Sequence, residues 1–267
     1  MGGRVYWFWG FVTEPLLTAL RPNVIVEVGA WTGRTTEKLL TFAHSRQAAL
    51  HVIDPAPRFD ELAFQERWPG TMTLHRGLSH DILPELPPAD AVLIDGDHNW
   101  FTVYNELRML RQPYPLVLLH DVAWPYARRD VYYEPDRIPA EHRQPTAKAG
   151  VRPGKSELEP GGPNGHLHHA IHEGGPRNGV LTAIEDFMAD APEPVEFARI
   201  PGGHGLGILM PARLLKQREV REQWARLHSA EFLYEHCERL EAAADRRTSA
   251  VFDLRRQVGG DGLAAKS

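Results

Sequence analysis

Cysteine is almost absent from this chain of 267 residues, which contains only Cys237. A single thiol excludes an internal disulfide bond, and alone it cannot hold a zinc ion or an iron–sulfur cluster. We therefore expect Cys237 to serve in packing.

An excess of basic residues and a long hydrophobic run are missing as well. The chain has 30 Lys and Arg against 35 Asp and Glu, a net charge of −5 and a pI near 6.3. Binding to nucleic acid phosphates requires clustered positive charge, which this composition lacks. No run approaches the roughly 18 apolar residues of a membrane span, and residues 1–15 lack the features of a secretory leader. We expect a cytoplasmic protein with no nucleic-acid partner and no membrane partner.

The pattern of hydrophobic residues predicts the fold class. Hydrophobic residues make up 42% of the chain and charged residues 24%, as in ordinary globular proteins. In the first half, short β-branched runs alternate with segments of helical periodicity, which predicts an α/β fold with a Rossmann-like, doubly wound and mostly parallel sheet. The expected strands are 23–28, 48–54, 71–76, 90–95 and 115–121, and the clearest helices are 35–45 and 101–110.

Residues 124–178 interrupt this alternation. They contain eight prolines and seven glycines, too many for regular elements. We expect an irregular lid or a disordered segment that lies over the acceptor region. Order resumes with a predicted helix at 178–189, followed by two runs at 195–200 and 205–211 that read as an antiparallel hairpin closing the sheet.

The chain ends in a predicted long helix from Arg213 to about Val258, which Gly259–Gly260 would end. Its apolar residues recur at steps of three or four, which predicts burial against a partner subunit or against the sheet. We expect a homo-oligomer formed through this helix. The sequence thus predicts one domain over 1–211 and a helical tail over 212–267.

The stretch "VIVEVGAWTG", residues 24–33, joins the first strand to the first helix through two glycines. A dinucleotide site would need a further glycine where Trp31 stands, so the ligand here should lack a pyrophosphate. Asp54 ends the second strand 21 residues after Gly33, a position from which a carboxylate binds ribose hydroxyls. These residues predict a nucleoside ligand at the carboxyl ends of the strands.

The pattern E-x-G-x-x-x-G, the acid at 54 and the later "DAVLIDGDH" together resemble class I S-adenosylmethionine-dependent methyltransferases. In that family the glycine turn cradles the methionine portion, the acid after the second strand binds ribose, and the loop after the third strand meets adenine. The resemblance implies S-adenosylmethionine as cofactor, and it matches seven residues to cofactor binding: Glu27, Gly29, Ala30, Gly33, Asp54, Ser79 and Asp95. Alternatively, Glu27 and the glycines only shape a tight turn.

A second group of polar residues follows the fourth and fifth strands. "IDGDHNW" supplies Asp95, Asp97 and His98, and "LLHDVAW" supplies His120 and Asp121. Because polar groups on adjacent strand ends are costly to desolvate, the group predicts a cation or a polar substrate. Carboxylates with imidazole suit Mg²⁺ or Mn²⁺ better than zinc.

The pairing of D-G-x-H with H-D resembles a branch of small-molecule O-methyltransferases that includes sugar methyltransferases of natural-product biosynthesis. In metal-dependent members, the first Asp and an acidic pair after the fifth strand hold Mg²⁺, and the His is the base. The resemblance therefore implies Asp95, His120 and Asp121 as metal ligands and His98 as the catalytic base. Position 120 departs from the pattern, which has Glu there. Alternatively, His98 only caps the following helix.

The start of the segment 124–178 supplies aromatic and basic side chains suited to a sugar or a polar aromatic acceptor. The predicted substrate-binding residues are Trp124, Tyr126, Arg128 and Tyr132. Alternatively, these side chains only anchor the segment to the domain. Four histidines between residues 166 and 172 read as part of a polar lid or as a second metal site.

Three functions remain open from the sequence. The first is O-methylation of a hydroxyl on a sugar or another small natural-product-like acceptor, assisted by a divalent cation and His98. The second is a metal-independent N- or O-methyltransferase acting on another small molecule. The third is a non-catalytic nucleoside-binding partner protein, which would leave His98 and the acids without a role.

Overall fold

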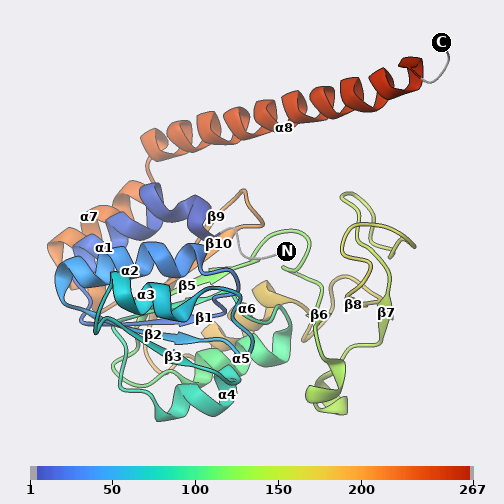
Figure 1. Cartoon of the computed structure of the whole chain (residues 1–267). Helices are drawn as coiled ribbons and strands as arrows, with labels where there is room; N and C mark the ends of the chain where they lie inside the picture. Colours follow the sequence, from blue (N-terminus) through green and yellow to red (C-terminus); the bar gives the residue numbers. More distant parts are fainter. Residues whose placement is uncertain (1–4, 265–267) are drawn as a thin grey trace. The chain divides into compact units, whose positions relative to one another are not determined.

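The computed structural model describes residues 5–264, with side chains as far as Arg256, and its central element is a seven-stranded sheet (Figure 1). The strand order is β3-β2-β1-β4-β5-β10-β9, and β10 runs antiparallel to both of its neighbours while the other pairs are parallel. The strands are β1 (Val24–Val28), β2 (Ala49–Ile53), β3 (Met72–His75), β4 (Ala91–Ile94), β5 (Leu116–His120), β9 (Val195–Ile200) and β10 (Leu206–Pro211). The predicted doubly wound sheet with an antiparallel strand pair is confirmed.

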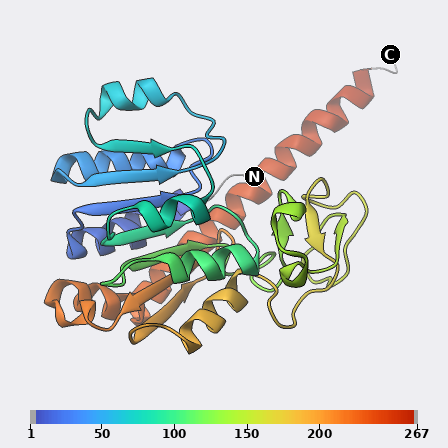
Figure 2. The same ribbon diagram turned by 90° about the horizontal axis from the view of Figure 1, so that it is seen from below.

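Helices cover both faces of this sheet, as Figures 1 and 2 show. One apolar layer joins Ile25 and Leu50 to helix side chains such as Leu17 and Leu39. The other joins Val26 and Val92 to Trp100, Ile184 and their neighbours. Successive residues of β1 therefore face opposite layers. The helices are α1 (Glu14–Leu20), α2 (Arg34–Arg46), α3 (Glu61–Arg67), α4 (Ser79–Ile82), α5 (Trp100–Met109) and α6 (Val180–Ala189), with short turns η1 (Val5–Phe8), η2 (Trp9–Thr13) and η3 (Leu83–Glu85).

The strand order reverses between β1 and β4, which lie side by side although β2 and β3 separate them in the chain. In an open parallel sheet, ligands bind beyond the carboxyl ends of the strands at such a point. The glycine turn after β1 and the polar residues after β4 and β5 all belong to this edge.

Residues 124–178 contain regular structure, and the expectation of an irregular segment is wrong in this respect. Three short antiparallel strands form a second sheet of order β6-β8-β7, set beside the main sheet (Figure 2). They are β6 (Val131–Tyr132), β7 (Thr146–Lys148) and β8 (His168–Ala170), with turns η4 (Pro135–Arg137) and η5 (Ala140–His142). Strands of two or three residues are too short to show the alternation by which a strand is predicted.

The tail differs from the prediction of one helix. It consists of η6 (Leu214–Lys216), α7 (Arg218–Leu227) and α8 (Ala230–Ala264), and the chain forms two compact units, Met1–Arg221 and Glu222–Ser267. Ser229 interrupts the helix, because its Oγ accepts a hydrogen bond from Phe232 N (3.1 Å) and so caps α8. Helix α8 continues past Gly259–Gly260, and Cys237 is exposed on it instead of packed. None of the helices in residues 5–264 is both long and apolar enough to span a membrane.

Candidate active site

The turn after β1 depends on its glycines. Gly29 has a φ of 84°, and a Cβ there would lie 2.4 Å from the backbone oxygen of Asp95. A side chain at this position would therefore push apart the ends of β1 and β4. Gly33 has a φ of 75° and donates its N–H to Ala30 O (2.8 Å), which closes the turn just before α2 begins.

Asp54, at the end of β2, holds this turn in place. Its Oδ2 accepts hydrogen bonds from Ala30 N (2.8 Å) and Trp31 N (2.7 Å), and its Oδ1 accepts one from Ala56 N (2.7 Å). A carboxylate offers about four lone-pair sites, so capacity remains for a hydroxyl of a ligand. The residue predicted to bind ribose thus also builds the pocket in which ribose would lie.

A cavity of about 500 Å³ lies at the carboxyl ends of β1, β2 and β4. Most of the predicted cofactor residues line it, namely Gly29, Ala30, Asp54, Ser79 and Asp95. His98, the predicted base, lines the same cavity. Gly33 and Glu27 are not among the lining residues. From the segment after β5, Tyr133, His166 and Leu167 complete the wall. The structure therefore joins the predicted nucleoside site and the predicted base in one cavity.

Glu27 is completely buried in β1, and neither of its carboxylate oxygens has a hydrogen-bond partner among the described residues. Burial, reinforced by the charges of Asp95 and Asp54, raises the pKa of Glu27 to about 8. Burial therefore favours the neutral form of this carboxyl group at pH 7. Its predicted contact with the cofactor stays a prediction.

Glu106 of α5 is a cavity residue that sequence reasoning missed. It is completely buried, and Ser79 donates its hydroxyl proton to Glu106 Oε1 (2.5 Å). Burial raises the pKa of Glu106 to about 8. A signal for it existed, because Glu106 lies between the apolar Val103 and Leu107 on the inward face of the helix.

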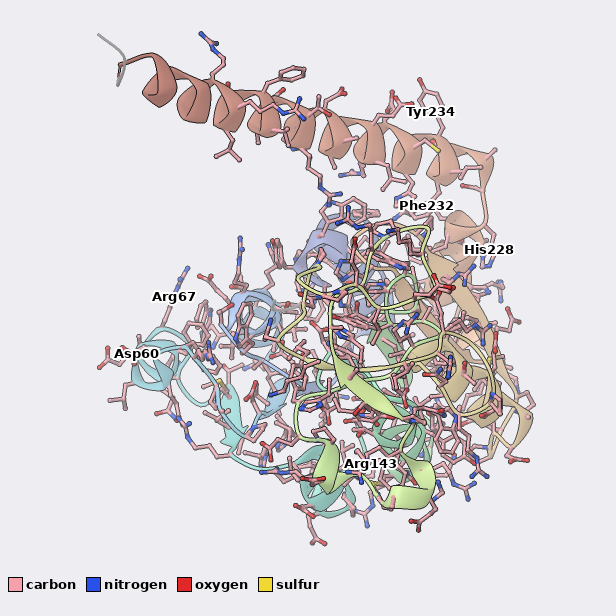
Figure 3. The ribbon with its side chains drawn as sticks, turned by 90° about the vertical axis from the view of Figure 1, so that its right-hand side faces the viewer. Asp60, Arg67, Arg143, His228, Phe232 and Tyr234 are labelled. Atoms are coloured by element: carbon pink, nitrogen blue, oxygen red, sulfur yellow. The ribbon has the colours of Figure 1, made fainter. Side chains whose placement is uncertain are left out.

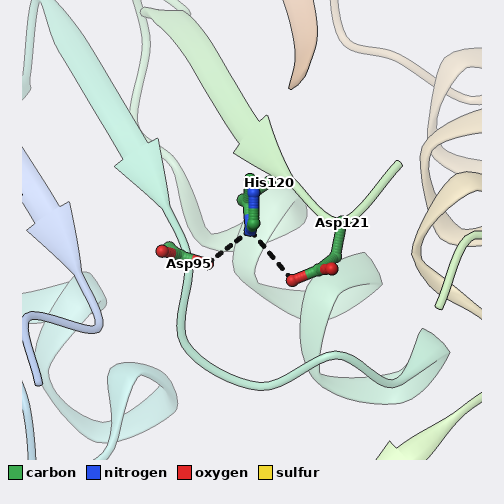
Figure 4. Close-up of side chains that lie close together, drawn as sticks. All are labelled: Asp95, His120 and Asp121. Carbon is green, nitrogen blue, oxygen red and sulfur yellow. Dashed lines mark hydrogen bonds and ion pairs between the residues drawn. The ribbon is translucent and has the colours of Figure 1, made fainter. Parts of the chain in front are cut away.

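Asp95, His120 and Asp121 lie close together, as Figure 4 shows. His120 Nδ1 is 3.0 Å from Asp95 Oδ1 and 2.9 Å from Asp121 Oδ2. On the other side of the ring, His120 Nε2 donates to Gly203 O (2.7 Å). Because a carbonyl oxygen only accepts, Nε2 carries a proton and Nδ1 is the nitrogen that faces both carboxylates.

The pKa values of His120 and Asp121 depend on the charges of the residues around them. Burial alone would lower the pKa of His120, but the carboxylates of Asp95 and Asp121 outweigh it and hold that pKa well above its usual value. Burial would likewise raise the pKa of Asp121, but His98 and His120 outweigh it and hold the pKa far below its usual range. A positive charge between the two carboxylates is therefore strongly favoured.

The residues present also fit a divalent cation. One ligand atom from each of the three residues lies within 4.8 Å of the others. Asp95 Oδ1 is buried without a hydrogen-bond partner among the described residues, its contact with His120 being an ion pair only. His204, which sequence reasoning missed in "PGGHG", adds Nδ1 at 3.1 Å from Asp121 Oδ1. Among residues 5–256, no other group of three or more His, Cys, Asp and Glu converges in this way, and the histidines of residues 166–172 belong to no such group.

His98 is held at the boundary between the cavity and this group. Its ring stacks on Tyr126 with centroids 5.4 Å apart, and its Nε2 lies 3.4 Å from Asp121 Oδ2. The following helix is capped by its neighbour, because Asn99 Oδ1 accepts a hydrogen bond from Thr102 N (2.9 Å). The alternative that His98 serves only as the helix cap is therefore wrong.

The four predicted substrate-binding residues, Trp124, Tyr126, Arg128 and Tyr132, are not among the residues that line the cavity. Tyr132 is buried and donates to Asp130 Oδ2 (2.6 Å), and Arg128 forms a bidentate ion pair with Glu185 (2.5 and 2.6 Å). Tyr126 supports His98 and accepts a hydrogen bond from Asn164 (2.7 Å). For Tyr132 and Arg128 these contacts favour the alternative of anchoring the segment, and Trp124, partly exposed, stays a prediction.

Residues 26–122, from within β1 to just after β5, match the family model of a methyltransferase domain. No curated protein sequence matches the chain. Among solved structures, the chain is similar to a methyltransferase of Podospora anserina bound to S-adenosylhomocysteine, with 14% identity, 79% of this chain and 80% of that chain covered, and a TM-score of 0.47. It is also similar to 1,6-didemethyltoxoflavin-N1-methyltransferase of Burkholderia thailandensis, with 13% identity, 77% and 79% coverage, and a TM-score of 0.42.

The segment that matches a methyltransferase domain thus carries the glycine turn, Asp54, the polar group after β4 and the His-Asp pair after β5. The prediction of a methyltransferase domain is confirmed for residues 26–122, and S-adenosylmethionine as its cofactor stays a prediction.

Proposed function

We propose that this enzyme methylates a hydroxyl group of a sugar or another small natural-product-like acceptor, with a divalent cation and a histidine base. The observation that carries the proposal is the position of His98, which lines the cavity and lies 3.4 Å from Asp121 of the Asp95, His120 and Asp121 group. A sugar hydroxyl is almost un-ionised at pH 7, so its attack on a methyl group requires acidification, a base, or both.

The cofactor would lie along the cavity wall. S-adenosylmethionine supplies an electrophilic methyl group on sulfur when it is bound. The glycine turn at Gly29 and Ala30 would hold the methionine portion, Asp54 would accept from ribose hydroxyls, and Ser79, hydrogen-bonded to Glu106, would meet adenine. These residues would bind and orient the cofactor in the cavity that Asp95 and His98 also line.

Asp95, His120 and Asp121 would hold Mg²⁺ or Mn²⁺. The cation supplies a Lewis acid that lowers the pKa of an acceptor hydroxyl. For this role His120 must present an unprotonated Nδ1, and its hydrogen bond to Gly203 O keeps the other proton on Nε2 in the required orientation.

His98 takes the proton of the acceptor hydroxyl as the methyl group moves. The Asp121 carboxylate, 3.4 Å from His98 Nε2, stabilises the imidazolium that forms. Tyr126 fixes the plane of the ring by stacking, and Tyr133 closes the cavity beside it. Tyr133 and His166, which line the cavity, would meet the acceptor in place of Arg128 and Tyr132.

A metal-independent methyltransferase, acting on oxygen or nitrogen, is the second candidate. It is favoured by the protonated state of His120, because an imidazolium between Asp95 and Asp121 already neutralises the group without a cation. A non-catalytic nucleoside-binding protein is weaker, because it gives no role to His98 at the cavity wall.

The test is transfer of a labelled methyl group from S-adenosylmethionine to a panel of glycosides, phenols and amines, with Mg²⁺ in one arm and a chelator in the other. We expect label on a hydroxyl compound, dependent on Mg²⁺. Label on an amine, or transfer that survives chelation, would favour the second candidate. Cofactor binding by calorimetry without transfer to any acceptor would favour the third.

We further propose that the acceptor is a small molecule, that residues 1–211 form the catalytic domain with 212–267 as a tail, and that the chain forms a homo-oligomer through its C-terminal helix.

A further inference from the structure

Helix α8 carries a regular seam of positions that are apolar except for Arg247. Leu233, Val251 and Leu254 are 60%, 46% and 60% exposed. They belong to a series with alternating steps of four and three residues, the spacing of a coiled-coil seam. The series is Leu233, Cys237, Leu240, Ala244, Arg247, Val251 and Leu254. Figure 3 shows Tyr234, next to this seam, projecting from the helix.

The charges of the same helix are divided by sign. Residues 230–245 contain five acidic residues, Glu231, Glu235, Glu238, Glu241 and Asp245, and one basic residue, Arg239. Residues 246–256 contain four arginines, Arg246, Arg247, Arg255 and Arg256, and one acidic residue, Asp253. The helix therefore has an acidic first half and a basic second half.

We infer that α8 pairs with α8 of a second copy of this chain in antiparallel orientation. Antiparallel pairing places the acidic half of each helix beside the basic half of the other. Parallel pairing would set acidic half against acidic half and Arg247 against Arg247 in the seam, which is unfavourable on both counts.

The seam fixes the register of this pair. Ala244 lies at the two-fold axis, where a small side chain lets the helices approach closely. Leu233 then packs against Leu254 of the second copy, and Cys237 packs against its Val251. Arg247 lies opposite Leu240 of the second copy. Its long side chain can therefore extend to Glu241, also of the second copy. The one charged seam position is thus satisfied only in the antiparallel register.

This inference rests on the proposed homo-oligomer, not on the proposed methyl transfer, and Cys237 supplies the test. In the antiparallel pair the two Cys237 residues are separated by 14 residues of helix, about 21 Å at 1.5 Å per residue. A disulfide requires Cα atoms within about 7 Å. Under mild oxidation the parent chain should therefore not cross-link, whereas Val251→Cys should form a disulfide-linked dimer with Cys237 of the second copy.

The matched control is Val251→Cys combined with Cys237→Ser, which should not cross-link. Cross-linking of the parent chain or of this control would indicate parallel pairing and overturn the inference. A monomer by light scattering with no cross-linking in any variant would overturn both the inference and the proposed oligomer, and methyl transfer measured on the same samples would be unaffected.

Charge reversal gives an independent readout by sedimentation at fixed protein concentration. Arg247→Glu should weaken the dimer at least tenfold, because it places Glu beside Glu241 of the second copy. Adding Glu241→Arg should restore the dimer. A dimer of unchanged strength in Arg247→Glu would overturn the antiparallel register, because parallel pairing sets residue 247 against itself and the substitution then replaces one like-charge contact by another.

Discussion

His120 Nε2 donates a hydrogen bond to the carbonyl oxygen of Gly203, 2.7 Å away. Gly203 has a φ of 52° and belongs to the turn between β9 and β10, whereas His120 ends β5. The turn that leads into β10, the antiparallel strand beside β5, thus supplies the carbonyl group that orients His120, a predicted metal ligand. The contact directs Nδ1 toward Asp95 and Asp121, as a ligand to a cation requires.

Asp121→Asn should weaken Mn²⁺ binding at least tenfold in calorimetry, because it removes one of the two charged ligands. Asparagine has nearly the same shape and tolerates the φ of 61° at this position, so the fold should survive. The control is Asp97→Asn, since Asp97 lines the same cavity but does not belong to the converging group. Equal losses in both variants would contradict the assignment of ligands.

Removing the cation should abolish turnover and spare cofactor binding. Chelation leaves the glycine turn and Asp54 intact, because both are held by hydrogen bonds within the protein. We expect calorimetry with S-adenosylhomocysteine to be unchanged by the chelator, and Mg²⁺ or Mn²⁺ to restore turnover. Full turnover after exhaustive chelation would assign the chain to the metal-independent class.

The sheet could be predicted from the sequence because its central strands are buried on both faces. β4 reads as a continuous apolar run and β1 as one interrupted only by Glu27, and both start and end within about a residue of the predicted ranges. Gly29, Asp54 and Asp95 could be assigned to one site because parallel strands bring their carboxyl ends to one edge.

Features that depend on contacts between distant segments could not be predicted. Strand β8 forms only because His169 meets Val131 and Ala147, far apart in the sequence. The sequence predicts that Tyr132 binds a ligand, whereas in the structure its hydroxyl group donates a hydrogen bond to Asp130. The contribution of His204 depends on how the turn after β9 folds back over Asp121. Local pattern carries no information on such side-chain directions.

Asp54 should have two separable effects on cofactor affinity, one through the turn and one through ribose. Asp54→Asn should reduce the affinity for S-adenosylhomocysteine at least tenfold, the scale of a lost charge-assisted hydrogen bond. If Asp54 binds ribose, the 2′-deoxy analogue should bind the parent chain more weakly than the natural compound, and the variant should lose this preference. If Asp54→Asn still binds the natural compound more tightly than the 2′-deoxy analogue, Asp54 acts only by holding the glycine turn. Asp60→Asn, an exposed helix cap, is the control.

Glu27 should make the protein less stable as pH rises from 5.5 to 8.5. Its pKa is 4.5 when exposed and about 8 in the folded chain, so the unfolded state loses its proton first. The free energy of unfolding should therefore fall across this interval, by about 3 kcal/mol from this group, and become constant above the folded pKa. Glu27→Gln should remove that part of the fall in urea denaturation. An unchanged pH profile in the variant would show that Glu27 is ionised in the fold.

His98→Asn tests the base separately from the helix cap. Asn99 caps α5, so a substitution at His98 leaves the cap intact, and the loss of turnover should come from chemistry. A general base contributes about 10²–10⁴-fold in rate, so turnover should fall at least a hundredfold at unchanged cofactor affinity. Asn99→Ala is the matched control: it should cost about 1 kcal/mol of stability, as the loss of a cap does, and leave turnover within a few-fold. The two variants should thus show opposite patterns in melting temperature and turnover, measured with the acceptor that labelled methyl transfer identifies. Turnover of His98→Asn within a few-fold of the parent would show that the proton leaves by another route, with Asp97 at the same cavity wall as the next residue to substitute.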